Sequence, residues 1–304
     1  MSVDGKDRSL TLGIVQMAMA ESVEANDETA EQGIREAARS GAGLICLPEL
    51  YRSRYFCQTE SETPFALAEP VPGPTTERLV ALARELGVCI VASLFERRAA
   101  GIFHNTAAVI DTSGYVGKYR KMHIPDDPHY YEKYYFTMGD LGFLRFDTSA
   151  GPLGVLLCWD QWYPEAARLT AMQGAEILIY PTAIGWHPQE KEQNGSSQLA
   201  SWELVQRSHA VTNGCYVVAV NRVGFESAPD GAGGIEFWGS SFVAGPDGEI
   251  VTQLRPDEPG VIVTTLDCSA VERSRIAWPF MRDRRIDAYG ALTRRWSDES
   301  GESA

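Results

Sequence analysis

The sequence predicts an α/β protein, a four-layer αββα sandwich of two mixed β-sheets with helices on the outside. Three observations lead to this fold class. Short apolar runs alternate with amphipathic segments, hairpins follow them, and the second half of the chain repeats the order of the first. Alternating strands and helices give parallel strands whose outer faces are covered, while hairpins add antiparallel strands. Two such halves pack sheet against sheet with pseudo-twofold symmetry.

The elements of the first half follow from apolar runs and helix caps. Dense apolar runs predict buried strands, and apolar residues three or four positions apart predict helices. Thr75 or Thr76 caps the second helix, and glycines end both helices. The predicted strands are 10–18, 44–47, 88–95, 105–110 and 115–119, the last two joined by a turn at 111–114, and the helices are 23–39 and 75–87.

The second half repeats this order of elements. The predicted strands are 154–157, 177–180, 215–220, 241–244, 249–254 and 261–266, and the helices are about 164–173 and 197–211. Three pairs of segments correspond: AGLICLPEL with AEILIYPTA, GVCIVAS with GCYVVAV, and AAVIDTSGYV with SFVAGPDGEI. Identity between the halves is weak, but the consistent order indicates an internal duplication.

The chain is predicted to form one domain. No Gly/Ser-rich linker separates the halves, so residues 1–304 are assigned to a single unit with a core at about 9–268. The segment 270–296 is predicted to be a helix that mixes aromatic side chains with arginines. Because these residues are favoured at interfaces, we expect an arm at about 269–296 to contact a partner subunit, followed by a solvated tail at 297–304.

Composition and charge exclude several classes of partner. The chain has 304 residues, of which 44% are hydrophobic and 22% charged, and its net charge is -14. This acidic balance argues against nucleic acid and anionic membranes. The N-terminal segment MSVDGKDRSL is polar, unlike a signal peptide, and no apolar run approaches the ~20 residues needed to cross a bilayer. We therefore expect neither nucleic acid nor membrane as a partner.

The six cysteines favour a cytoplasmic protein without a metal centre. None forms a C-x-x-C pair, and no Cys/His group has the spacing of a zinc site. Cys46, Cys89 and Cys215 lie inside apolar runs and are interpreted as inert core thiols. A reducing cytoplasm fits this cysteine usage best.

The stretch GVLLCWDQWYPEAAR at 154–168 places Cys158 where a nucleophile is expected. It is interpreted as a buried strand with the cysteine at its end, a polar turn, and a helix that begins near Pro164. Such a turn presents sulfur to a cleft, and the helix N-terminus favours the thiolate. The alternative, a small buried hydrophobic residue at the end of a core strand, is equally compatible with this stretch alone.

Three further residues are candidates to act with a thiolate. Attack on an amide-like carbonyl needs a base, an oxyanion donor and groups that fix the substrate, and such sites gather at strand ends. Glu49 follows the apolar run LICLP, and Lys121 ends a hairpin strand. Glu132 lies among tyrosines in HYYEKYYF, where a lone charge is costly without a partner. The alternatives are a surface or helix-capping acid at Glu49 and a solvated edge strand at Lys121.

Three ordered blocks resemble the nitrilase superfamily of carbon–nitrogen hydrolases over nearly the whole chain. They are LPEL around Glu49, YRKMHIPDDPHYYEKYYF around Lys121 and Glu132, and CWDQWYPEAAR around Cys158. The resemblance implies an αββα fold and a Glu–Lys–Cys triad that works without a metal or an organic cofactor. It also implies a homo-oligomer, a dimer or larger.

The resemblance implies a role for each matching residue. Cys158 is the nucleophile, and Glu49 is the general base and acid. Lys121 and the backbone N–H of Trp159 hold the oxyanion, and Glu132 orients the site and the substrate nitrogen.

Further blocks are most similar to the branch of the superfamily that hydrolyses N-carbamoylputrescine. These blocks are YFCQTE, PTAIG, NRVG and WPFMRDRRIDAY. The similarity implies a small-molecule ureido substrate, a role in polyamine biosynthesis, and a pocket lined by Tyr55 and by the pair Trp186 and His187. Many members of that branch have Ser-Glu in place of Trp186 and His187, so an acid beside the pocket is replaced here. Trp186 either contacts a distal ammonium by a cation–π interaction or packs over the site.

Other activities remain open at the level of sequence. One is a different amidase of the superfamily, which acts on a plain amide or on an N-carbamoyl acid. An acid substrate requires Arg or Lys in the pocket, whereas an amine requires carboxylates or aromatic rings. A nitrile hydrolase and a non-catalytic binding module of the same fold are weaker alternatives, because all four catalytic positions are filled.

Overall fold

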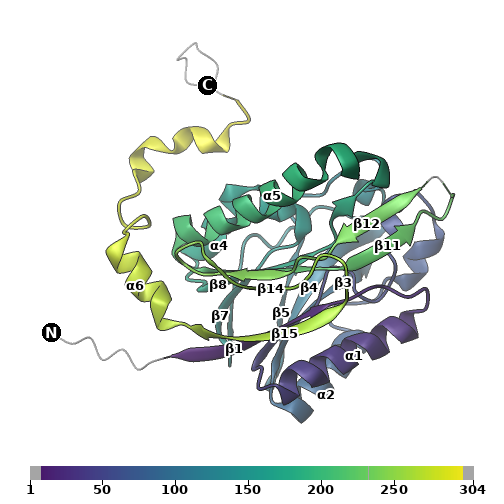
Figure 1. Ribbon diagram of the computed structural model, residues 1–304, viewed down its shortest axis with the longest axis horizontal. Coiled ribbons are helices and arrows are strands. Elements are labelled where there is room, and N and C mark those ends of the chain that lie inside the picture. The colour runs from purple at the N-terminus through teal and green to yellow at the C-terminus, as the bar shows by residue number, and fades with distance from the viewer. Residues whose placement is uncertain (1–7, 232, 297–304) are drawn as a thin grey trace.

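The computed structural model describes residues 8–231 and 233–296, and it has four layers (Figure 1). Two six-stranded mixed sheets lie between outer helices. The first sheet contains, in spatial order, β15 (Gly260–Asp267), β1 (Ser9–Gln16), β2 (Leu44–Cys46), β3 (Cys89–Ala99), β4 (Ile102–Asp111) and β5 (Gly114–Arg120). The second contains β14 (Ile250–Gln253), β13 (Phe242–Ala244), β10 (Tyr216–Asn221), β8 (Ile177–Thr182), β7 (Gly151–Val155) and β6 (Arg145–Thr148). The predicted fold class is thereby confirmed.

The two sheets share one topology. Strands β1, β2 and β3 are parallel and are followed by antiparallel β4 and β5, and β7, β8 and β10 are parallel and are followed by antiparallel β13 and β14. The crossover helices also correspond: α1 (Val23–Arg39) to α4 (Pro164–Met172), and α2 (Pro74–Leu86) to α5 (Pro188–Asn213). The duplication predicted from the sequence is therefore visible in the strand order.

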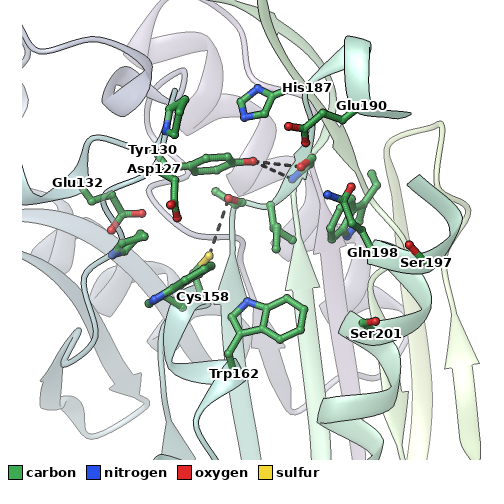
Figure 2. Close-up of a pocket in the computed structure, with 17 residues that line it drawn as sticks. Asp127, Tyr130, Glu132, Cys158, Trp162, His187, Glu190, Ser197, Gln198 and Ser201 are labelled. Atoms are coloured by element: carbon green, nitrogen blue, oxygen red, sulfur yellow. Dashed lines mark hydrogen bonds between the residues drawn. The ribbon is translucent and has the colours of Figure 1, made fainter. Parts of the chain in front are cut away.

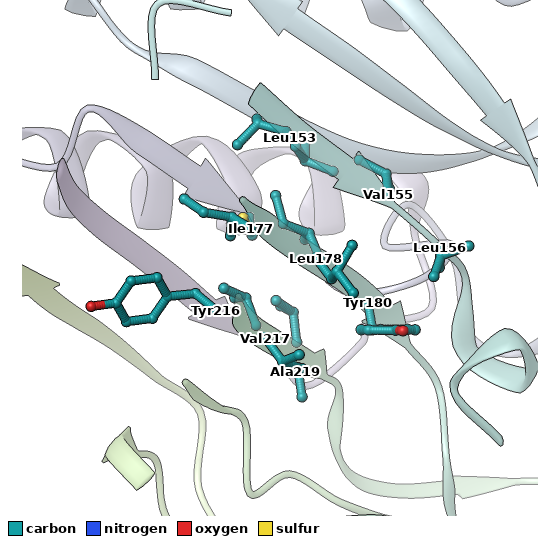
Figure 3. Close-up of a cluster of buried hydrophobic side chains, with 14 of the residues drawn as sticks. Leu153, Val155, Leu156, Ile177, Leu178, Tyr180, Tyr216, Val217 and Ala219 are labelled. Carbon is teal, nitrogen blue, oxygen red and sulfur yellow. The ribbon is translucent and has the colours of Figure 1, made fainter. Parts of the chain in front are cut away.

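The central strands are buried on both faces. In β2, Leu44 and Cys46 belong to the core between the sheets, whereas Ile45 belongs to the core under α1 and α2. Figure 3 shows the matching part of the second sheet, where Val155 on β7 and Leu178 on β8 are among the buried apolar side chains. Because neither face is solvated, these strands read as continuous apolar runs rather than as alternating patterns.

Several short elements around the edge of the sandwich have no counterpart in the prediction. They are the edge strand β6 of the second sheet, a three-stranded sheet of β9 (Gly185–Trp186), β12 (Gly234–Trp238) and β11 (Val223–Ser227), the short helices η1 (Phe56–Gln58), η2 (Thr63–Leu67) and α3 (Glu132–Tyr135), and a 3₁₀ helix η3 (Cys158–Trp162). Each is too short to show a clear hydrophobic period, so only the structure could define it.

Two predicted helices need correction. Helix α5 begins at Pro188 rather than near residue 197, because Pro188 fits the first helical position and the first two turns are solvated and show no apolar period. The predicted helix at 270–296 is wrong beyond its first third. Helix α6 (Ser269–Ala277) ends because Trp278 precedes a proline, which disfavours the helical conformation, and only the short turns η4 (Ile286–Ala288) and η5 (Gly290–Thr293) follow.

Some predictions fall outside what the structure describes or tests. The expected tail at 297–304 and residues 1–7 of the polar N-terminal segment lie outside the described residues. Within the described ranges, no helix is both long and apolar enough to cross a bilayer. The assignment of residues 1–304 to one domain stays a prediction.

Candidate active site

Four predicted site residues come together at one edge of the sandwich. Glu49 follows β2, Lys121 directly follows β5, and Cys158 begins η3 shortly after β7. Glu132 begins α3 in the segment that joins the two halves. The carboxyl ends of these strands meet at the same edge, which is where polar side chains of such folds gather.

Lys121 is the centre of the charged cluster. Its Nζ lies 2.9 Å from Glu49 Oε1, and 2.9 Å and 2.6 Å from the two carboxylate oxygens of Glu132. All three side chains are completely buried. A charge this far from water needs partners, so the arrangement excludes the interpretation of Lys121 as a residue of a solvated edge strand.

The two carboxylate oxygens of Glu49 have different surroundings. Oε1 accepts hydrogen bonds from Lys121 and, at 2.7 Å, from Asn105 Nδ2. Oε2 is buried and has no hydrogen-bond partner among the described residues. Ser93 Oγ supports the arrangement, because it donates to Asn105 Oδ1 and accepts from the backbone N–H of Leu50. Oε2 is therefore the oxygen left to exchange a proton.

Cys158 sits at a strained turn that opens into a cavity. Its φ of 40° lies in the left-handed region, which costs a non-glycine residue about 1–3 kcal/mol. Its Sγ lies 3.8 Å from the carbonyl oxygen of Ala183 (Figure 2). Strain of this kind persists only where the surrounding structure over-determines it, which makes the position a functional candidate.

The expected preference of Cys158 for the thiolate is wrong. Burial and the negative charge of Glu49 raise the pKa of the Cys158 thiol well above its usual value, and Lys121 offsets this only in part. Helix α4 begins at Pro164, so its N-terminus is not directly at the sulfur. The thiol therefore needs a base at the moment of attack.

The charges of the cluster do not balance, because one lysine faces two carboxylates. Burial alone would lower the pKa of Lys121, but Glu132 and Glu49 raise it well above its usual value, so it stays an ammonium. Burial raises the pKa of Glu132 to about 7, with Lys121 acting against the rise and Glu49 adding to it. Near neutral pH Glu132 therefore takes up or releases a proton readily.

Asp160 holds the cysteine turn against the strand end that precedes Lys121. Its Oδ2 accepts hydrogen bonds from Leu157 N at 3.0 Å and from Tyr119 OH at 2.8 Å, and its Oδ1 accepts from His123 N at 3.0 Å. One buried carboxylate thus fixes residues on both sides of the site. The sequence analysis assigned no role to it, because an aspartate in a polar turn carries no distinguishing pattern.

The cavity beside Cys158 has a volume of about 480 Å³ and an acidic, aromatic wall (Figure 2). Asp127 and Glu190 line it together with Glu132, and none of the described residues that line it is Lys or Arg. Its aromatic side chains are Tyr130, Trp159, Trp162 and Trp238, and its hydroxyl and amide side chains are Ser197, Gln198 and Ser201. A cationic ligand is favoured in such a cavity and an anionic one is disfavoured.

The predicted substrate-binding residues divide into two groups. Trp159 and His187 line the cavity, whereas Tyr55 and Trp186 are buried and lie outside its lining. The Tyr55 hydroxyl donates to Glu132 Oε1 at 2.7 Å. Trp186 Nε1 donates to Gly195 O at 3.1 Å, and the cation over its ring is Lys191, 4.9 Å away. This placement favours a packing role for Trp186 rather than a cation–π contact with substrate.

Two acids of the cavity had not been singled out in the sequence. Asp127 lies in the block IPDDPH, and Glu190 lies in the first turn of the unpredicted part of α5. Glu190 follows the pair Trp186 and His187, where many members of the branch have an acid. Glu190 thus supplies an acid to this wall from a different position in the sequence. Burial lowers the pKa of His187, so this ring adds no positive charge near neutral pH.

The part of the chain that the structure describes contains no group of three or more His, Cys, Asp or Glu side chains arranged to hold a metal ion. The expectation of chemistry without a metal or cofactor stays a prediction.

Comparison with known proteins places this arrangement in a family. The model of the family "Carbon-nitrogen hydrolase" matches residues 11–276. The chain belongs to this carbon–nitrogen hydrolase family, the nitrilase superfamily, and is an enzyme that cleaves carbon–nitrogen bonds of linear amides.

Individual relatives agree with this assignment. The chain is 45% identical over 291 residues to the N-carbamoylputrescine amidase of Solanum lycopersicum, covering 94% of this chain and 96% of that protein. It is 35% identical to a citrullinase of Francisella tularensis, covering 95% and 99%. A crystal structure of a carbon–nitrogen hydrolase from Helicobacter pylori G27 is 44% identical, with a TM-score of 0.92 over 95% of this chain and 100% of that one.

Proposed function

We propose that this enzyme hydrolyses N-carbamoylputrescine to putrescine, carbon dioxide and ammonia. The central observation is that Cys158 opens into a cavity with Asp127 and Glu190 on its wall and no described lysine or arginine. The distal ammonium of this substrate pairs with carboxylates and aromatic rings, whereas an N-carbamoyl acid lacks a cation for its carboxylate. Full-length similarity to plant amidases of that name supports the same substrate.

The first half of the reaction forms a carbamoyl thioester. Glu49 Oε2 takes the proton of the Cys158 thiol as Sγ attacks the ureido carbonyl carbon. The resulting oxyanion is held by the Lys121 ammonium and the backbone N–H of Trp159. The bond to the terminal nitrogen then breaks, and Glu49 returns the proton to the leaving group, which departs as ammonia.

The second half of the reaction hydrolyses the thioester. Glu49 takes a proton from water, the hydroxide attacks the carbamoyl carbon, and Lys121 holds the second oxyanion. The carbon–sulfur bond breaks, and the thiolate of Cys158 regains a proton from Glu49. The released carbamate decomposes to carbon dioxide and the free amine. Throughout, Glu132 holds Lys121 through two short contacts and faces the substrate nitrogen.

Citrulline is the second candidate substrate, because the citrullinase of Francisella tularensis is a relative over nearly the whole chain. Citrulline has both an ammonium and a carboxylate beyond its ureido group. The acidic wall fits the ammonium, but it repels the carboxylate. We therefore expect citrulline to be a poorer substrate than N-carbamoylputrescine.

A substrate panel tests the proposal. Ammonia release is measured with N-carbamoylputrescine, citrulline, N-carbamoyl-β-alanine and neutral N-butylurea at equal concentrations. The expected order of kcat/KM is N-carbamoylputrescine first, N-butylurea and citrulline lower, and N-carbamoyl-β-alanine lowest. A preference for N-carbamoyl-β-alanine or citrulline would contradict the proposed function and would imply a cation that reaches the cavity from elsewhere.

We also propose that the enzyme is a cytoplasmic homo-oligomer. Its six cysteines are all unpaired, which supports a reducing compartment. Exposed apolar side chains on the C-terminal arm, among them Trp278, Ile286, Leu292 and Trp296, support a subunit interface there. Sedimentation of the full chain and of a Trp278→Ala, Ile286→Ala variant tests the assembly, and a monomeric wild type would contradict it.

A further inference from the structure

A buried ion pair outside the cavity lining holds the loop that contains Glu49 and Tyr55. Arg222 lies between β10 and β11, and Glu226 lies on β11. Arg222 Nη1 is 2.9 Å from Glu226 Oε1, and the two side chains are 0% and 2% exposed. Neither residue contacts the thiol or lines the cavity, and the mechanism above uses neither of them.

The hydrogen bonds of this pair converge on one loop. Arg222 Nη2 donates to Glu49 O at 2.6 Å and Leu50 O at 3.1 Å, and Nη1 donates to Ser53 O at 3.2 Å. Glu226 Oε2 accepts from the backbone N–H of Tyr55 at 2.6 Å. Four backbone groups between positions 49 and 55 are thus bound by two side chains from the other half of the chain.

The loop needs such support because part of it is strained. Leu50 has a φ of 48°, in the left-handed region, where a bulky residue is held only by its surroundings. The strained residue Leu50 directly follows Glu49. The carbonyl oxygens of both residues accept hydrogen bonds from Arg222. Relaxation of this turn would move the carboxylate of Glu49 away from Lys121.

The same loop also sets the second glutamate. Tyr55, whose N–H is bound by Glu226, donates its hydroxyl to Glu132 Oε1 at 2.7 Å. The guanidinium of Arg222 further lies 5.8 Å from the centre of the Tyr55 ring. Both carboxylates that hold Lys121 therefore depend on one segment, and that segment depends on one ion pair.

We propose that the Arg222–Glu226 ion pair is a positioning device that sets Glu49 and, through Tyr55, Glu132 against Lys121. Stability alone does not account for it, because an apolar pair of similar volume is often at least as stabilising as a buried ion pair. What an apolar pair does not provide is the set of donors and acceptors that fixes this loop. The inference rests on the roles proposed for Glu49 and Glu132.

The test compares Glu226→Gln with a matched control, Asp111→Asn. Asp111 is also a buried carboxylate that accepts a backbone N–H, from Ser149 at 2.6 Å, but it lies at the far end of the β4–β5 hairpin. Glu226→Gln is expected to lower kcat roughly 10- to 100-fold, as a misplaced catalytic group does, with KM changed less than about threefold. Asp111→Asn is expected to lower the melting temperature while leaving kcat at the wild-type value.

A second measurement does not depend on the natural substrate. The rate at which iodoacetamide alkylates Cys158, followed by mass spectrometry of its peptide, reports whether Glu49 still removes the thiol proton. Glu226→Gln is expected to slow this reaction and to shift its pH dependence upward. If Glu226→Gln does not fold, Arg222→Lys serves instead, because it retains the charge but not the fork that spans three carbonyls.

The outcomes separate the two proposals. Wild-type kcat and an unchanged alkylation profile in folded Glu226→Gln, or an equal loss in Asp111→Asn, would overturn the positioning role. A rise in KM alone would also overturn it. Failure of the wild type to turn over N-carbamoylputrescine, with slowed alkylation in Glu226→Gln, would instead overturn the proposed substrate and leave the positioning role standing.

Discussion

The two halves of the sandwich have the same order of strands and helices but contribute different chemistry. In the first half, β2 is followed by Pro48 and Glu49. In the second half, the equivalent strand β8 ends in Pro181 and Thr182. These two ends touch, because Glu49 N donates to Thr182 O at 3.3 Å. The first half thus supplies the acid and, after β5, the lysine, whereas the second half supplies the thiol and much of the cavity wall.

This difference teaches where function arises in a duplicated fold. The repeat provides two buried sheets whose strand ends meet at one edge. Chemistry appears only where the repeat is broken, with Glu49 in one half and Thr182 in the other. The Arg222–Glu226 pair of the second half then fixes the loop of the first, so neither half forms the site alone.

Replacing the Cys158 thiol, which the second half supplies, should cause the largest loss of kcat. Cys158→Ser places a poorer nucleophile at the same strained turn, and the covalent scheme predicts a loss of roughly 10³-fold or more in kcat. Ammonia release measures the rate, and intact mass after substrate addition reports the carbamoyl adduct on the wild type. Cys215→Ala, which changes a buried thiol directly before β10 in the same half, is the control and should keep wild-type turnover. Ordinary turnover in Cys158→Ser would refute the scheme.

Replacing Lys121, which the first half supplies, should lower kcat almost as much. Lys121→Ala deletes an oxyanion donor, which typically costs about 3–4 kcal/mol of barrier, and it leaves two buried carboxylates without their cation. We expect a loss of kcat of the order of 10²–10³-fold and a lower melting temperature. Lys118→Ala changes a lysine within β5 that pairs with Glu96, and it should lose stability but little kcat. Equal rate losses in both variants would show that strand integrity, not the ammonium at position 121, limits the rate.

The pH dependence of kcat/KM should sharpen the comparison, because it reports the charge of the cluster of Glu49, Lys121 and Glu132. Burial raises the pKa of Glu132 to about 7, and a protonated Glu132 no longer holds the Lys121 ammonium as a carboxylate does. kcat/KM should therefore fall about tenfold per unit as pH drops below about 7, while Lys121, whose pKa is raised, stays charged.

Tyr55→Phe gives this profile an internal check. The hydroxyl of Tyr55 hydrogen-bonds the Glu132 carboxylate and so lowers the pKa of that group relative to burial alone. Its removal should move the acid limb of the profile upward in pH. A flat wild-type profile down to about pH 5, or an unshifted acid limb in Tyr55→Phe, would contradict the raised pKa of Glu132.

The strands and the central site residues were accessible from the sequence for a physical reason. Strands buried on both faces must be apolar throughout, so an acid at the end of one stands out, as at Glu49. Lys121 follows the half-buried strand β5 and was located by its place at the end of a hairpin strand. Helix α5 was placed too short because its first two turns are solvated and have no apolar face. The thiolate preference of Cys158 was wrong because burial and a neighbouring carboxylate depend on segments that meet only in the folded chain.

Contacts to substrate were the least predictable part. Tyr55 and Trp186 were expected at the pocket because they belong to similar blocks, yet both are buried outside the cavity lining and hydrogen-bond protein atoms instead. Asp127 and Glu190 reach the cavity from a loop and from an unpredicted helix turn, so their partnership is a property of the fold. Pattern and spacing locate a strand end, but they do not tell which side chain faces a cavity.

The acidic wall should show the smallest effect, one of affinity rather than of rate. Asp127→Asn and Glu190→Gln each remove one charge near the expected ammonium. Both side chains are exposed, so solvent limits each contact to about 0.2–1 kcal/mol, which corresponds to a rise in KM of about 1.5- to 5-fold. kcat should change little, because neither side chain contacts the reacting atoms. Raising the salt concentration should weaken wild-type binding of the diamine derivative in the same direction.

Neutral N-butylurea separates charge recognition from simple disturbance of the cavity. Its KM should be the same in the wild type, Asp127→Asn and Glu190→Gln, because it has no ammonium to lose a partner. Glu192→Gln changes an exposed acid two positions along α5 that does not line the cavity, and it should leave both substrates unaffected. If KM rises equally for both substrates, the two acids shape the wall rather than recognise a cation, and the amine must be selected by the aromatic rings of the second half.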